Sequence, residues 1–293
     1  MVFTLDSAKS ETIDRYFRDY LAETPYWPGK VLLDYSLGLH QAWRSTIPLL
    51  PIGEGMRLLD VGTGYGLLAD ELIANLRLTI LGIDIDPQYV DGARDLHAAL
   101  SKEGVFISGS KASFEEGDIC DLPCPDASFE FIMVREVYQF IADTDKATSE
   151  LMRATVPGGF VCVSDNDDGF FITYPESSEA FRSIHQAVDR EQNSYGGDRQ
   201  VGRKLSTMLS QGGFDILAVS AMPESRHWTV TADDPERLFL IEQMKEAKAR
   251  VVACGAANVE DYDRWLSEFE EEQMGERFRF NARILVVGRK PAA

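Results

Sequence analysis

The chain has 293 residues, of which 48 are acidic and 29 are basic, so its formal net charge is −19. This charge repels phosphate backbones and anionic lipid, which argues against nucleic acid or a membrane surface as the main partner. The composition, 44% hydrophobic and 26% charged, is that of an ordinary globular protein. A chain of this length buries a sizeable core without help from disulfides or metals.

The four cysteines, Cys120, Cys124, Cys162 and Cys254, form no CxxC pair. This pattern is typical of a reducing compartment and predicts neither a disulfide framework nor a metal site. No apolar run approaches the roughly 18 residues of a membrane span, and the first residues lack the pattern of a signal peptide. We therefore expect a cytoplasmic protein.

The apolar spacing of residues 1–50 predicts helices, broken into at least two pieces by Pro25, Pro28 and Gly29. From Arg57 onward, short apolar runs alternate with helical patterns, which predicts a parallel sheet with crossover helices. Two helices are expected within 231–275. The other expected helices are 66–76, 87–100 and 145–155, and the expected strands are 57–61, 79–84, 113–116, 129–134, 159–164, 212–222 and 277–290.

A glycine turn between the first strand and the following helix is the most informative segment. Gly62, Gly64 and Gly66 alternate with other residues, so the backbone can turn sharply and a ligand can approach without meeting a Cβ atom. The free amides at the start of the helix favour a polar or anionic ligand group. Asp84 lies 22 residues after Gly62 at the end of the second strand, where an acid accepts both hydroxyls of a ribose.

Two cofactor classes use such a strand, turn, helix and acid. A nicotinamide dinucleotide requires the spacing GxGxxG, but this chain has Leu67 where the third glycine would fall. The carboxylate of Asp60, two residues before the first glycine, would crowd a pyrophosphate and would instead orient an ammonium group. The loop therefore suits S-adenosylmethionine better than a dinucleotide.

From this loop onward, the sequence resembles the class I S-adenosylmethionine-dependent methyltransferases. The matching segments, in chain order, are LLDVGTGYG (58–66), FEEGDI (114–119), DLP (121–123), SFEFI (128–132) and ELMRATVPGG (150–159). Residues 202–214 and 257–291 are similar to the ubiquinone/menaquinone-type branch of small-molecule methyltransferases. The resemblance implies a Rossmann-like α/β fold, with a seven-stranded mixed sheet and helices on both faces. We expect an N-terminal helical lid at 1–50 and a cofactor-binding domain at 51–293, with a helical insertion at 231–275.

The resemblance also assigns cofactor contacts to positions of this sequence. Phe140 stands where the family has a histidine, so no histidine role is carried over to that position. The implied contacts are Asp60, Gly62, Thr63, Gly64 and Gly66 at the methionine end, Asp84 at the ribose, Ile85, Asp118 and Ile119 at the adenine, and Arg135 beside the cofactor. Tyr20, in the N-terminal helices, would close over the cofactor.

Methyl transfer from a sulfonium depends mainly on alignment and exclusion of water. A general base matters only where the nucleophile must lose a proton. Asp165 and Asp167 follow the fifth strand, where open α/β sheets bind ligands, and either carboxylate would accept a proton or bind a cationic amine, unless the loop is merely solvated. The other catalytic candidates are Tyr138, which would line the substrate pocket unless it packs in the core, and the histidines His185 and His227.

We therefore expect methyl transfer from S-adenosylmethionine to a small organic acceptor. The aromatic-rich N-terminus favours an apolar or aromatic acceptor of natural-product type, while a choice among carbon, nitrogen and oxygen as nucleophile stays open, as does a homodimer. A second class also stays open: a protein that binds S-adenosylmethionine without transferring methyl and catalyses a cyclisation or rearrangement. The cofactor loop serves both classes and does not separate them.

Overall fold

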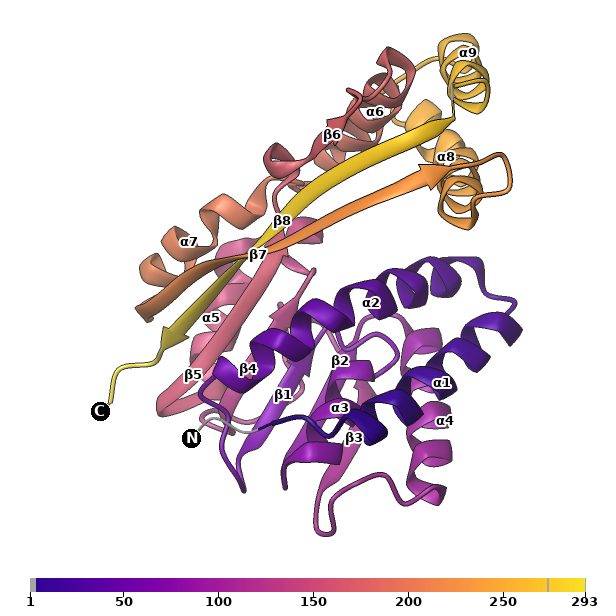
Figure 1. Ribbon diagram of the computed structural model, residues 1–293. Helices are drawn as coiled ribbons and strands as arrows, with labels where there is room; N and C mark the ends of the chain where they lie inside the picture. Colours follow the sequence, from indigo (N-terminus) through magenta and orange to yellow (C-terminus); the bar gives the residue numbers. More distant parts are fainter. Residues whose placement is uncertain (1–3, 273, 293) are drawn as a thin grey trace.

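The computed structural model describes residues 4–272 and 274–292, which form an α/β fold with one mixed sheet covered by helices on both faces (Figure 1). In this part of the chain, the strands lie in the order β3-β2-β1-β4-β5-β8, with β7 along one edge of β8 and β6 on its other edge beyond β5. The strands are β1 (Arg57–Val61), β2 (Thr79–Asp84), β3 (Lys111–Glu116), β4 (Phe129–Arg135), β5 (Thr155–Asn166), β6 (Ile172–Tyr174), β7 (Asp215–Val230) and β8 (Gly275–Arg289).

Strands β1 to β5 are mutually parallel, and β8 runs antiparallel to β5. Parallel strands are buried on both faces, which explains the continuous apolar runs of β1 and β4. The crossover helices α3 (Leu67–Asn75), α4 (Pro87–Lys102) and α5 (Thr144–Ala154) confirm the predicted alternation. Helix α4 begins where the side chain of Asp86 caps it and Pro87 occupies the first turn.

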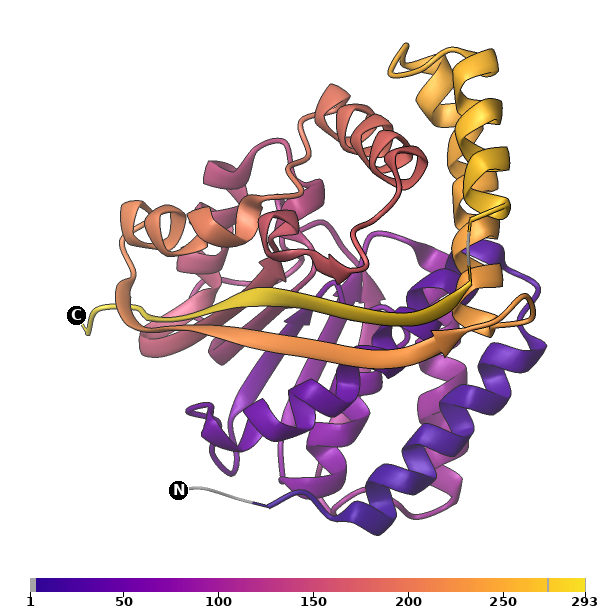
Figure 2. The ribbon, with the colours of Figure 1, turned by 45° about the horizontal axis from the view of Figure 1, so that its top comes forward.

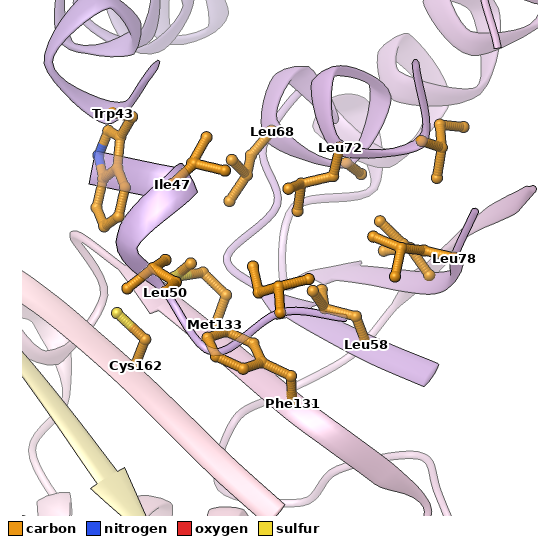
Figure 3. Close-up of a cluster of buried hydrophobic side chains, with 14 of the residues drawn as sticks. Trp43, Ile47, Leu50, Leu58, Leu68, Leu72, Leu78, Phe131, Met133 and Cys162 are labelled. Carbon is orange, nitrogen blue, oxygen red and sulfur yellow. The ribbon is translucent and has the colours of Figure 1, made fainter. Parts of the chain in front are cut away.

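Two N-terminal helices, α1 (Ser7–Glu23) and α2 (Trp27–Thr46), confirm the predicted helical pieces, and the 3-10 turn η1 (Ile47–Leu49) follows them. The C-terminal half of α2 is anchored in the main core. Figure 3 shows Trp43 and Ile47 lying beside Leu68 and Leu72 of α3, above Met133 and Cys162 of the sheet. Helix α2 is thereby held across one face of the sheet (Figure 1).

The long hairpin of β7 and β8 extends well past the rest of the sheet (Figure 2). Helices α8 (Pro235–Ala253) and α9 (Val259–Glu270) lie at its far end and confirm the two helices expected within 231–275. Helix α6 (Glu179–Ser194) packs on both of them through a separate apolar cluster that includes Ile184, Met244 and Tyr262. Two features of this architecture were not predicted: strand β6, which makes the sheet eight-stranded, and the helices α6 and α7 (Leu205–Gln211).

The remaining 3-10 turns are η2 (Tyr138–Phe140), η3 (Asp168–Phe170) and η4 (Val201–Lys204), and all three lie near the carboxyl ends of β4 and β5. None of the helices in residues 4–272 and 274–292 has the length and apolar character needed to cross a bilayer.

A buried ion network fixes α1 and α2 to α3. Glu71 of α3 is fully buried and accepts hydrogen bonds from Ser10 Oγ at 2.5 Å and Arg44 Nη2 at 2.8 Å, while His40 Nε2 lies 3.1 Å from its Oε2 atom. Arg44 also forms a two-bond pair with Asp14. Burial alone would raise the pKa of Glu71, but the hydrogen bonds from His40, Ser10 and Arg44 outweigh it and lower the pKa to about 2.

We predict that Glu71→Gln lowers the free energy of unfolding by about 3–5 kcal/mol at pH 7, because it removes the buried negative charge that Ser10, His40 and Arg44 surround. The loss should shrink as the pH falls from 4.5, the ordinary carboxyl pKa, towards 2, since the stability contributed by a depressed pKa disappears over that range. Urea unfolding at several pH values measures both effects. Glu242→Gln, which alters an exposed pair with Lys245, is the matched control and should be near neutral.

Candidate active site

The glycine loop joins β1 to α3 at the carboxyl edge of the sheet. Gly62 and Gly64 have φ angles of 69° and 55°, in the left-handed region that favours glycine. A Cβ atom at Gly62 would lie 2.2 Å from Val137 Cγ2, so any other residue there would displace the segment after β4. Thr63 holds the loop by donating its hydroxyl hydrogen to Asp60 Oδ2 at 2.8 Å.

Asp60 is fully buried, and its second carboxylate oxygen, Oδ1, has no hydrogen-bond partner. Burial raises the pKa of Asp60, partly opposed by the charge of Arg135, whose Nη2 atom lies 3.8 Å from Asp60 Oδ2. A buried carboxylate oxygen without a donor is costly, so this position is suited to receive one from a ligand. An ammonium group supplies such a donor.

Asp84 ties the second strand to the glycine loop. Its Oδ2 atom accepts a hydrogen bond from the Gly64 amide at 2.8 Å, and its Oδ1 atom accepts one from the Asp86 amide at 3.1 Å. Burial raises the pKa of Asp84, and these two amides oppose the rise. The strand register places Ile85 next to the segment of Asp118 after β3, and both side chains are exposed, Ile85 by 70%.

The remaining expected cofactor residues lie near the carboxyl edge of the sheet and differ in burial and in their neighbours. Ile119 is buried in the core, and Gly66 directly precedes α3. Arg135, at the end of β4, faces Asp60 and lies over the ring of Trp43 at 5.5 Å. Tyr20 of α1 packs against the ring of Tyr65, next to the glycine loop, with ring centroids 5.5 Å apart.

A polar network that was not predicted lies at the carboxyl ends of β4 and β5. The hydroxyl of Tyr35, on α2, donates to Glu136 Oε2 at 3.0 Å and accepts from Arg283 Nη2 at 2.8 Å. Arg283 Nε lies 3.3 Å from Glu136 Oε1, and Asn166 is also within hydrogen-bond distance of Tyr35. Glu136 has a φ of 56°, which is rare for a glutamate and is typical of functional sites.

Of the two aspartates predicted to be catalytic, Asp165 is fully buried and accepts hydrogen bonds from the amides of Asn166 and Gln139. Burial and the neighbouring charge of Glu136 raise the pKa of Asp165 well above its usual range. Asp167 is held in a bidentate ion pair with Arg203. Both carboxylates therefore already have partners that shape the loop.

The other three candidates are placed apart. Tyr138 is fully buried, and its hydroxyl pairs with the Thr148 hydroxyl at 2.9 Å. It therefore faces the core rather than a cavity, and we assign it no role in the substrate pocket. His227 is exposed on β7, and the alternation of the strand turns it away from the cavity wall formed by its neighbour Trp228. His185 of α6 does line the cavities, and burial together with the charge of Arg199 lowers its pKa to about 4, so it is neutral at pH 7.

Two adjoining cavities lie between α2, α6 and the long hairpin, and they share a wall that includes Tyr35, Phe171, Phe181 and His185. The first, of about 330 Å³, reaches towards α8 and α9 and is lined by aromatic and aliphatic side chains, including Trp228, and by charged side chains of both signs, including Glu236 and Arg279. The second, of about 640 Å³, is more polar and extends to Asn166, Arg199 and Arg283. Tyr35 thus connects both cavities to the ends of β4 and β5.

Among the described residues, no cluster of three His, Cys, Asp or Glu side chains is arranged to hold a metal ion. Cys120 and Cys124 are both free thiols, and burial raises the pKa of each.

Comparison with known proteins identifies the segment that contains the loop. Residues 59–163 match the family described as Methyltransferase domain, and the match spans Asp60, Asp84, Asp118 and Arg135. This segment is similar to a methyltransferase domain. S-adenosylmethionine is the cofactor of such domains.

Individual proteins agree with the family match. The chain is 34% identical over 126 residues to demethylmenaquinone methyltransferase of Deinococcus radiodurans, covering 42% of this chain and 49% of the relative. The solved structure of YcgJ protein from Bacillus subtilis matches with a TM-score of 0.54, at 18% identity, over 87% of this chain and all of that one.

Phosphoethanolamine N-methyltransferase 2 of Haemonchus contortus, solved with S-adenosyl-L-methionine, matches with a TM-score of 0.51, at 20% identity, over 94% of this chain and 60% of that one. These structural likenesses establish the fold. The chain spans 49% and 60% of the length of the first two curated relatives that it matches.

The residues present fit this cofactor at three places. The unpaired Oδ1 atom of Asp60 is an acceptor for the ammonium group, and Gly64 leaves room where a side chain would meet Leu32 of α2. The exposed Ile85 and Asp118 follow the neighbouring strands β2 and β3, and they offer an apolar face and an acceptor of the kind that an adenine ring requires.

We predict that Asp84→Ala weakens binding of S-adenosylhomocysteine by roughly 10- to 150-fold, because it removes a charge-assisted acceptor worth about 1.5–3 kcal/mol and releases the Gly64 amide. Calorimetric titration measures the loss. Asp91→Ala, which removes an exposed partner of Arg94 on α4, is the control and should bind like the wild type. Unchanged affinity in a folded Asp84→Ala protein would contradict the ribose assignment.

Proposed function

We propose that the protein transfers a methyl group from S-adenosylmethionine to a small organic acceptor bound between α2, α6 and the long hairpin. One observation carries this proposal: the buried Asp60 with an unpaired oxygen lies on a glycine loop inside a segment that matches a methyltransferase domain. Of the two cavities that share Tyr35, the larger reaches Asn166 at the end of β5.

In this proposal, Asp60, Gly62 and Gly64 hold the methionine end of the cofactor, and Asp84 holds the ribose. Ile85, Asp118 and Ile119 surround the adenine. The bound cofactor supplies an already activated methyl group, so the protein's task is to align the acceptor and exclude water, which is worth roughly 7–11 kcal/mol. Residues 1–50 serve as a lid, since α2 lies over the loop through Leu32 and over Arg135 through Trp43.

An apolar or aromatic acceptor is supported by the lining of the smaller cavity. Phe171 and Phe181 stack with ring centroids 5.9 Å apart, and Phe181 lies 4.2 Å from the ring of His185. Because His185 is neutral at pH 7, it adds a planar surface without a charge. The relative from Deinococcus radiodurans favours the ubiquinone/menaquinone-type branch for this chain.

The net charge of −19 supports a small-molecule partner rather than nucleic acid, and a cytoplasmic location is proposed from the free cysteines.

The proposed methyl transfer is tested by incubating the protein with methyl-labelled S-adenosylmethionine and a panel of aromatic phenols, amines and enolic ketones. Label in an extracted product supports methyl transfer. Cofactor binding combined with an acceptor that is rearranged but unlabelled would favour the non-methylating class.

We predict that Phe181→Ala raises the KM for the acceptor identified in that screen by roughly tenfold or more, because truncation of a phenylalanine that lines both cavities removes stacking and burial worth at least about 1.4 kcal/mol. Affinity for S-adenosylhomocysteine should stay unchanged, as measured by calorimetry. Phe140→Ala, at a half-exposed position outside the lining of the two cavities, serves as the control. Equal effects of the two variants on KM would place the acceptor elsewhere.

A further inference from the structure

The network of Tyr35, Glu136 and Arg283 connects the acceptor cavities to a buried carboxylate. Tyr35 lines both cavities and leaves about a third of its surface exposed, whereas Glu136 lies behind it, mostly buried. The hydroxyl hydrogen of Tyr35 points to Glu136 Oε2 at 3.0 Å, and the phenol oxygen accepts from Arg283 Nη2 at 2.8 Å. Asn166 Nδ2, at 3.3 Å, is its weaker second donor, so a hydroxyl group in the cavity would bond to the phenol oxygen in place of Asn166. This arrangement gives a route for a proton from the cavity to Glu136.

The position of the network relative to the cofactor loop makes this route relevant to methyl transfer. Glu136 directly follows Arg135, which faces Asp60 on the glycine loop. Tyr35 is three residues after Leu32, which lies over Gly64. One turn of α2 therefore reaches both the expected methionine end of the cofactor and the hydroxyl at the cavity wall.

The positive charge of Arg283 favours an oxygen nucleophile beside Tyr35. Its Nη2 atom donates to the oxygen of Tyr35 at 2.8 Å, and its guanidinium group lies over the Tyr35 ring, 5.3 Å from the centroid. A fixed positive charge beside the reacting atom stabilises negative charge that develops on an acceptor oxygen. The same charge repels an amine that becomes cationic as it accepts a methyl group.

We propose that Tyr35 and Glu136 form a proton relay for an acceptor with a hydroxyl nucleophile, a phenol or an enol, so that the reaction is O-methylation. The acceptor O–H bond breaks and its proton passes to Tyr35 Oη, while the original hydroxyl proton of Tyr35 passes to Glu136 Oε2. The new O–CH₃ bond forms as the donor S–CH₃ bond breaks, and protonated Glu136 later releases its proton to water. This inference rests on the proposed methyltransferase function.

The charges that surround Glu136 come from every neighbouring element. Arg135 on β4, Arg283 on β8 and Arg199 before η4 favour its charged form, as does the hydrogen bond from Tyr35, while Asp165 on β5 is a like charge. Burial outweighs the cations and raises the pKa of Glu136, which makes it a stronger base than an exposed glutamate. Burial and the charge of Glu136 also raise the pKa of Tyr35, so Tyr35 passes a proton on and does not hold the negative charge itself.

The pair itself is tested first, without cofactor or acceptor. Protein labelled with ¹³C at the tyrosine Cζ is titrated by NMR between pH 4 and 9, and the Tyr35 signal is identified by its loss in Tyr35→Phe. We expect a shift of the Tyr35 signal at the raised pKa of Glu136 that is lost in Glu136→Gln. A Tyr35 signal that does not change with pH, or that changes equally in Glu136→Gln, would overturn the relay.

Turnover then tests the role in the reaction. With the acceptor from the labelling screen, Glu136→Gln and Tyr35→Phe should each lower kcat about 100-fold or more and lose the acid limb of the pH profile, with unchanged affinity for S-adenosylhomocysteine. Tyr195→Phe, at an exposed position, should behave as the wild type. Wild-type rates and pH profiles in both variants, or transfer to an aromatic amine in preference to the phenol of the same skeleton, would overturn the inference alone. Failure of the wild type to bind the cofactor or to methylate any acceptor would overturn the proposed function as well.

Discussion

The attachment of helix α2 to the sheet is the constraint on which the rest of the site depends. Glu71, fully buried on α3, binds Ser10, His40 and Arg44, and Trp43 and Ile47 pack in the core beneath (Figure 3). Because these contacts fix the C-terminal half of α2, its preceding turns cross the carboxyl edge of the sheet in a defined position. A buried charged network of this kind loses its stabilising effect if any partner is removed.

Helix α2 lies between the glycine loop and the two cavities and contacts both. On one side, Leu32 contacts the position of Gly64, where the backbone has room for a ligand and no side chain. On the other side, Tyr35 lines the cavities beneath α6 and the long hairpin. In the proposed function, the donor at the loop and the acceptor in the cavities would therefore both contact this helix.

Much of the architecture could be predicted from local signals. The apolar runs of β1, β2 and β4 and the glycine turn fix the parallel half of the sheet, because buried parallel strands have continuous apolar sequences. Helix α6 was not predicted because its many charged residues obscure the short apolar stripe around Ile184. This stripe is buried only by packing against α8 and α9. Strand β6 has three residues, which is too short for a periodicity to be recognised.

The candidate site could be predicted only where one segment supplies its residues. The loop from Asp60 to Gly66 and the acid at Asp84 follow from spacing along the chain. The network of Tyr35, Glu136 and Arg283 joins residues 101 and 248 positions apart in the chain, which no local pattern can reveal. The positive φ of Glu136 has no signature in the sequence either. Asp167 follows β5 as predicted, but Asp165 lies within the strand, which is longer than expected. The hydrogen-bond partners of the two aspartates come from the backbone and from Arg203.

The most direct test of the account is a calorimetric titration of the wild-type protein with S-adenosylmethionine, S-adenosylhomocysteine and NAD under identical conditions. We expect both adenosyl ligands to bind at micromolar concentrations and NAD not to bind, because the loop offers a buried carboxylate where a pyrophosphate would lie. Binding of NAD, or of none of the three ligands, would contradict it.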